Sequence, residues 1–82
     1  MAAQSLQLQP FDTYTALARR IQAIINRPRA QIEHQVNIAK EPHESEQDWE
    51  YLLEELRDAE GVTLTRRADG SVHLAWFVRN EL

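Results

Sequence analysis

The chain of 82 residues contains no cysteine and only two glycines. The absence of cysteine excludes disulfide bonds, thiolate metal sites and cysteine catalysis, and it fits a reducing cytoplasm. Two isolated glycines cannot build a glycine-rich phosphate-binding loop. No apolar run approaches the length of a membrane span, and the start MAAQSLQLQP lacks the basic and hydrophobic blocks of a signal peptide. We therefore expect an unprocessed cytoplasmic protein that does not enter a membrane.

Groups that carry chemistry are also scarce. The three histidines, His34, His43 and His73, have no metal-ligating partner at convincing spacing, since His43 and Glu46 would supply only two ligands. No serine lies in a nucleophile motif. Carboxylates are abundant, but nothing in the sequence buries them, so we expect ordinary pKa values and poor acid-base catalysis. The sequence predicts no enzymatic activity, no metal and no cofactor.

Charge is distributed unevenly along the chain. The net charge is −4, yet residues 41–60 hold nine acidic residues against one arginine, which gives −8. Residues 1–40 carry +3 and residues 61–82 carry +1. Such segregation predicts a molecule with one strongly negative side.

The acidic segment has the pattern of an amphipathic helix over residues 45–58. Apolar residues recur at helical spacing, so they share one face that must be buried: Trp49, Leu52, Leu53, Leu56 and Ala59. Ser45 is a good N-cap, and Asp48 three residues later makes a pair that resembles a capping box. Gly61 supplies a natural stop.

The opposite face of this helix carries the candidate partner-binding residues, Glu46, Glu50, Tyr51, Glu54, Glu55 and Asp58. Charged helix faces usually serve solubility, and that is the simpler interpretation. The alternative is a contact surface for a host protein with a basic surface. In that case the carboxylates would imitate a phosphate array, as a DNA mimic does, and Tyr51 would anchor the contact.

A second amphipathic helix is predicted from Phe11 to about Asn26, with Asp12 or Thr13 as its cap. It ends there because Pro28 moves Arg27 out of the α region. Its outer side is basic, which suggests a second function, a small DNA-binding transcriptional regulator. The nucleic-acid-binding residues would then be Arg19, Arg20, Arg27 and Arg29. The acidic helix disfavours this alternative because it would repel a duplex.

Three strands are predicted. Residues 32–38 alternate with period two and place His34 inward, as a structural histidine at the edge of the core. Residues 62–66 and 72–79 form a hairpin through the turn at Asp69 and Gly70. A right-handed crossover through the acidic helix would make the first two strands parallel, with the third antiparallel. In the last strand Phe77 is left on the outer face, where it favours self-association.

These elements predict an α+β fold, a small two-layer domain of order α-β-α-β-β in which two helices pack on a three-stranded sheet. Residues 1–9 are expected to form a flexible tail and residues 10–82 a single domain. So short a chain has a modest core, which favours a homodimer over a monomer.

Several motifs together resemble a known family. They comprise the segment from Tyr14 to Gln31 with Arg19, Asn26 and Pro28, the Trp49-Glu50 pair, and the ending Asp69-Gly70-Ser71-Val72 followed by Leu74 and Trp76. This pattern is similar to a small family of uncharacterised proteins found in pseudomonads and their phages, which carries only a domain-of-unknown-function label. The distribution of that family implies a role in a mobile element or in regulation, without implying any catalytic residue.

Overall fold

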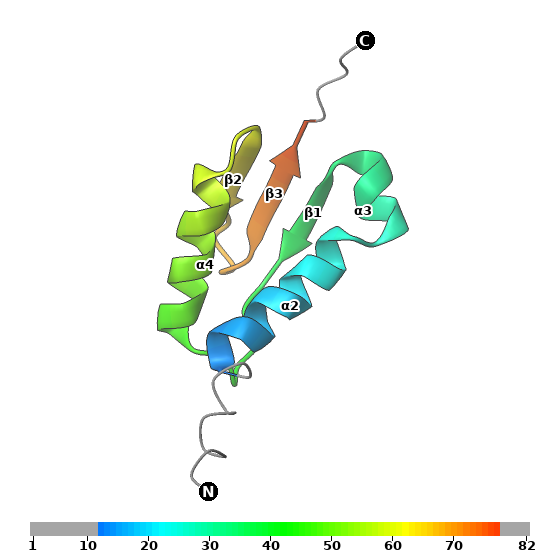
Figure 1. Ribbon diagram of the computed structural model, residues 1–82. Coiled ribbons are helices and arrows are strands. Elements are labelled where there is room, and N and C mark those ends of the chain that lie inside the picture. The colour runs from blue at the N-terminus through cyan, green and yellow to red at the C-terminus, as the bar shows by residue number, and fades with distance from the viewer. Residues whose placement is uncertain (1–11, 78–82) are drawn as a thin grey trace, which may run out of the picture.

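The computed structural model describes residues 12–77. Its elements are α2 (Thr13–Ile25), α3 (Pro28–Glu33), β1 (Gln35–Ile38), α4 (Glu46–Asp58), β2 (Val62–Arg66) and β3 (Val72–Trp76). Helices α2 and α4 pack on one face of the three-stranded sheet (Figure 1). The predicted α+β two-layer fold is confirmed, with one additional helix. The predicted tail, residues 1–9, and both domain limits lie outside the described residues.

The sheet has the strand order β1-β3-β2, and both pairings are antiparallel. Strands β1 and β2 therefore run in the same direction, as expected, but they are not neighbours, because β3 lies between them. Leu74 in the middle of β3 pairs with Val36 on one side and Leu64 on the other. The central position of β3 explains why Val72 and Leu74 are both only 1% exposed.

The core lies between the sheet and the two longer helices. Its buried side chains are Leu17 and Ile21 of α2, Trp49, Leu52 and Leu53 of α4, and Ile38, Val72 and Leu74 of the sheet. The apolar faces predicted for both helices are thus confirmed in their central turns. The prediction for Ala59 is wrong, because α4 ends at Asp58 and Ala59 is its exposed C-cap.

Both predicted N-caps are present. The Asp12 carboxylate accepts from the Thr15 N–H at 2.8 Å, and the Ser45 hydroxyl accepts from the N–H groups of Gln47 and Asp48 at 3.1 Å each. The expected capping-box contact of Asp48 does not form. Its carboxylate accepts instead from the hydroxyl of Thr13, the first residue of α2. This contact joins the N-terminal ends of α2 and α4.

The prediction of a strand from Ile32 is wrong in its first part, because residues 28–33 form the short helix α3. Pro28 holds Arg27 in the extended region, as predicted, but it also stands at the first turn of a helix, a position that proline favours. The helix ends at Glu33 and is followed by its C-cap His34, whose φ of 60° is left-handed. The strand begins only at Gln35, and Ile32 is 77% exposed rather than inward.

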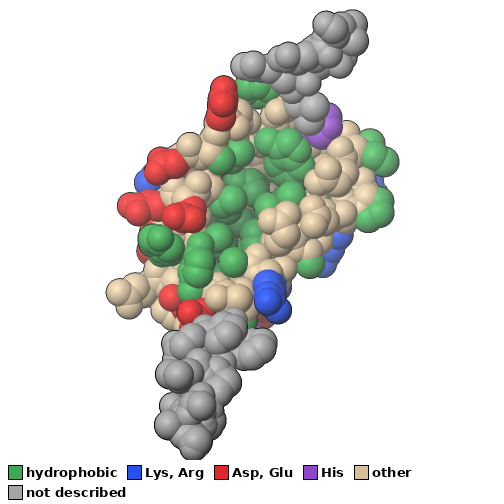
Figure 2. Space-filling model, viewed as in Figure 1, with side chains coloured by type: hydrophobic (Ala, Val, Ile, Leu, Met, Phe, Trp, Pro, Cys, Tyr) green, Lys and Arg blue, Asp and Glu red, His purple; other side chains and the backbone are tan. Residues whose placement is uncertain are grey.

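The two longer helices leave part of the sheet uncovered. They are close at their N-terminal ends, where Thr13 contacts Asp48. Figure 2 shows hydrophobic side chains across the middle of this face, between α4 and α2. Several apolar residues that pack against the core are accordingly only partly buried: Ile24, Ile25, Leu56, Val62 and Trp76. The small core expected from the chain length is therefore open on its helical side.

The outer face of the sheet is the side opposite α2 and α4, and no long helix of the described residues covers it (Figure 1). Gly70 allows the predicted turn with a φ of 93°. On β3, His73 and Ala75 point outward, and Phe77 continues the same face with a 65% exposed side chain, as predicted. The ring of Phe77 lies over Gly61, since a Cβ placed there would be 3.5 Å from the ring.

Candidate functional site

The acidic face of α4 is defined here as Glu46, Glu50, Tyr51, Glu54, Glu55 and Asp58. All six of these predicted partner-binding residues are exposed along one helix. The opposite side of α4 is fixed by Trp49, Leu52 and Leu53, which are 3%, 6% and 0% exposed. The backbone under the acidic face is therefore held in place by the core, so its side chains project from a rigid support.

One member of the acidic face is paired with the sheet. Two nitrogens of Arg66 donate to the Glu50 carboxylate at 2.6 and 3.2 Å, and both side chains are about half exposed. The Arg66 hydrogen bond lowers the pKa of Glu50. The sequence offers only Arg57, the single arginine of residues 41–60, as a counter-charge within this helix, and the pair with Arg66 was not predicted. The signal was present, because Arg66 follows Val62 and Leu64 at period two and so lies on the helix-facing side of β2.

The other four acids form no ion pair within residues 12–77: Glu46, Glu54, Glu55 and Asp58. Tyr51 lies among them and is 53% exposed. Its ring makes an edge-to-face contact with the ring of Tyr14, with 5.1 Å between the ring centroids. Burial raises the pKa of the Tyr14 hydroxyl, and the charge of Glu55 raises it further. The two tyrosines thus lie close to negative charge. The contact with Tyr14 limits the rotation of the Tyr51 side chain.

Arg20 does not point freely outward, contrary to the prediction for the basic side of the first helix. Its Nε and Nη2 donate to the two carboxylate oxygens of Glu44 at 2.8 and 2.6 Å, and Nη2 also donates to the Ala39 carbonyl. The Glu44 side chain is only 8% exposed. The hydrogen bonds from Arg20 lower the pKa of Glu44, and the same bonds raise that of Arg20. These contacts join α2 to residues 39–44, the segment that leads into α4.

The remaining candidate arginines are divided between surfaces. Arg19 is exposed on α2. Arg27 and Arg29 line a concavity of about 460 Å³, which we call the outer groove. Its lining consists of Arg27, Arg29, Ala30, Glu33, Gln35, Val36, Asn37, Arg67 and His73. Neither Arg19 nor Arg20 belongs to this lining, so the structure does not bring the four predicted nucleic-acid-binding residues into one site. Sequence reasoning missed Arg67, which follows β2 on its outward register.

The three histidines have different surroundings. His34 is half-buried with its ring 6.4 Å from that of Trp76, and His43 is exposed. The His73 Nε2 lies 2.9 Å from Oε1 of Gln35 across the outer face. In the part of the chain that the structure describes, no three His, Cys, Asp or Glu side chains could hold a metal ion. No helix there is long and apolar enough to cross a membrane.

The chain belongs to the family described as protein of unknown function (DUF1654), whose model matches residues 12–81. This match covers every element of the described fold and confirms membership of an uncharacterised family. The comparisons with curated proteins and with solved structures found no match.

Proposed function

We propose that this member of the DUF1654 family is a non-enzymatic interaction protein of a phage or prophage, which modulates or inhibits a host protein through the acidic face of α4. The expected target handles nucleic acid or acts in defence, and it has a basic surface. A row of carboxylates can occupy a groove that otherwise binds phosphates, because both present negative charge to a basic surface.

The observation that supports this proposal is the state of the acids on α4. Four carboxylates without an ion pair in residues 12–77 stand on a helix whose other side is buried. Little ordering of the backbone is then needed on binding, which lowers the entropic cost of association. Tyr51 adds a partly exposed ring held against Tyr14. Tyrosines in such positions are frequent anchors of protein interfaces.

A capture experiment tests the proposal. The tagged protein is incubated with a lysate of a pseudomonad host, with and without nuclease, and bound proteins are identified by mass spectrometry. We expect a partner with a basic surface whose recovery survives nuclease. Loss of all partners after nuclease treatment would contradict recognition by the acidic face, because bridging nucleic acid would then account for the capture.

The identified partner is then used to locate the contact. Glu54→Lys reverses one unpaired charge of the acidic face, and we expect it to weaken binding at least about tenfold through like-charge repulsion. Glu33→Lys is the control for net charge, because it makes the same charge change on α3 and removes only the exposed pair with Arg29 within that helix. Equal weakening by both variants would mean that net charge, and not the acidic face, governs binding. Glu50 is avoided because its reversal would break the pair with Arg66, which joins α4 to β2.

The alternative of a DNA-binding transcriptional regulator receives less support in its original form. One of its four cations, Arg20, is already engaged by Glu44 and by the Ala39 carbonyl. Arg27 and Arg29 instead belong to the outer groove together with Arg67. That second arginine cluster is a separate surface with its own chemistry.

A further inference from the structure

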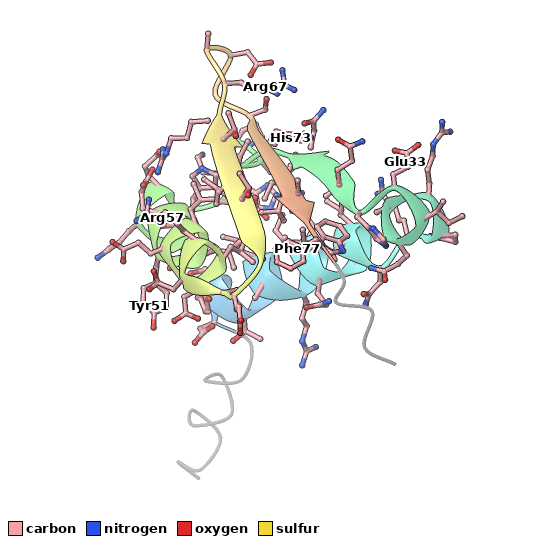
Figure 3. All side chains as sticks on the ribbon, turned by 90° about the horizontal axis from the view of Figure 1, so that it is seen from above. Glu33, Tyr51, Arg57, Arg67, His73 and Phe77 are labelled. Atoms are coloured by element: carbon pink, nitrogen blue, oxygen red, sulfur yellow. The ribbon has the colours of Figure 1, made fainter. Side chains whose placement is uncertain are left out.

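The outer groove combines three cationic side chains from distant parts of the chain. Arg27 and Arg29 come from the start of α3, and Arg67 comes from the β2–β3 hairpin. Figure 3 shows Arg67, His73 and Glu33 together on one side of the molecule, away from Tyr51 and Arg57 of α4. The fold therefore gathers positive charge on a surface distinct from the acidic face.

These arginines are only partly neutralised. Within the lining, Glu33 is the one carboxylate, and its Oε2 accepts from the Nε of Arg29 at 3.0 Å. The guanidinium groups of Arg27 and Arg67 form no ion pair in the described residues. Asp69 is close enough for the charge of Arg67 to lower its pKa, but its carboxylate accepts from Ser71. An anion is thus the complement of this surface, and arginine binds phosphate oxygens in a bidentate manner.

The sheet between the arginines is polar and carries groups that can recognise bases. Gln35 and Asn37 of β1 present side-chain amides, and His73 of β3 presents an imidazole ring linked to Gln35. Amides can both donate to and accept from a base edge, and imidazole and guanidinium planes can stack on a base. Watson–Crick edges and base faces are accessible in a single strand, whereas pairing and stacking cover them in a duplex.

We propose that the outer groove binds single-stranded nucleic acid. Arg27 and Arg67 contact backbone phosphates on opposite sides of the groove, and Asn37 and His73 contact a base between them. Arg29 contributes less to binding, because the carboxylate of Glu33 neutralises part of its positive charge. This site differs from the arginine-bearing first helix expected from the sequence, since it includes Arg67 and the sheet and excludes Arg19 and Arg20.

Fluorescence anisotropy with a labelled mixed-sequence oligonucleotide tests the site in the full chain. We expect binding that weakens as salt rises, that is tighter for the single strand than for the same sequence as a duplex, and that a mononucleotide competes for only weakly. Equal affinity for the duplex, or competition by a mononucleotide at the concentration of the oligonucleotide, would overturn the proposal. So would an absence of binding at low salt.

Charge-matched variants separate the groove from a general effect of positive charge. Arg27→Ala and Arg67→Ala are each expected to weaken binding about tenfold, by loss of one phosphate contact and any stacking on the guanidinium. Arg19→Ala and Arg57→Ala remove the same charge from exposed positions on α2 and α4. Equal weakening by all four variants would overturn the proposal.

A measurement on the unaltered protein keeps the test independent of how the variants fold. Amide chemical shifts are recorded by NMR while the oligonucleotide is titrated in. The expected changes concentrate on residues 27–37, 67 and 73. Changes confined to α2 or α4 would contradict the site, even if the oligonucleotide binds.

Discussion

At the scale of single residues, Arg20 and Glu44 form the most buried ion pair of residues 12–77. Two charge-assisted hydrogen bonds join them at 2.6 and 2.8 Å, and the Glu44 side chain is 8% exposed. The Glu41 N–H also donates to Glu44 at 2.8 Å. A carboxylate with these donors is more stable ionised in the folded state than in the unfolded chain, which is why its pKa is lowered.

The pH dependence of stability follows from that shift. A lowered pKa contributes stability that is present above the unfolded-state pKa and is lost as the pH falls through the folded-state pKa. We expect Glu44→Gln to reduce the free energy of unfolding by about 1 to 2 kcal/mol at neutral pH, because a neutral amide replaces the charged acceptor. The difference from the original protein should shrink toward zero in acid, below the ordinary glutamate pKa of 4.5.

Urea denaturation of both proteins at neutral and acidic pH checks this expectation. Glu54→Gln, at an exposed position of α4, is the control and should change the free energy of unfolding by less than about 0.5 kcal/mol at either pH. A destabilisation by Glu44→Gln that persists unchanged in acid would show that it does not arise from the ionised carboxylate.

The residues of the acidic face were predictable, whereas most of their partners were not. Helical periodicity alone separates Glu54 and Asp58 from the buried Leu52 and Leu53, and the structure finds that separation. Arg20 and Glu44 are 24 positions apart. Their pairing depends on how α2 packs beside the loop before α4, which no local pattern encodes. The outer groove could not be predicted for the same reason, since three separate segments meet there.

At the scale of elements, the position of the acidic face depends on how α4 begins. Ser45 caps two backbone N–H groups of the first turn. We expect Ser45→Ala to reduce the free energy of unfolding by about 1 kcal/mol, because those groups lose their acceptor. Ser45→Asp should restore most of the loss, since aspartate is an equally good cap. Thermal unfolding followed by circular dichroism measures both, and a failure of Ser45→Asp to recover stability would argue against the capping role.

Helix α3 shows where local patterns compete. Ile32, His34, Val36 and Ile38 fit a strand of period two, but Pro28 and the residues after it also fit one helical turn. The helix prevails because proline at the first position loses no backbone hydrogen bond there. His34 then adopts the left-handed conformation at the end of α3. Only Val36 and Ile38 keep the predicted inward register, and Ile38 is 2% exposed.

At the scale of the whole molecule, opposite charges occupy separate surfaces. The acidic face of α4 and the arginines of the outer groove come from different elements, and Figure 3 shows Tyr51 of the acidic face and Arg67 of the groove on different sides. The electrostatic potentials of nearby like charges on one surface add. Each surface can therefore attract an oppositely charged partner at long range when the ionic strength is low. The net charge of −4 therefore describes neither surface.

The expected homodimer is also a property of the whole molecule. Phe77 stands 65% exposed at the end of β3 opposite to Arg67 (Figure 3). An exposed phenylalanine beside Ala75 gains free energy when a second copy covers it, because apolar area leaves water. We expect concentration-dependent self-association in sedimentation velocity, and we expect Phe77→Ser to shift the equilibrium toward the monomer.

Ile32→Ser is the matched control for that experiment, because Ile32 is 77% exposed on a different element, α3. It should leave self-association unchanged. An equal shift by both variants would indicate non-specific apolar contact, and a protein that sediments as a monomer at every concentration would contradict the dimer itself. Thermal unfolding of Phe77→Ser must accompany the measurement, since the ring also covers Gly61. A monomer that retains the melting temperature of the original protein would assign the effect to the interface and not to the fold.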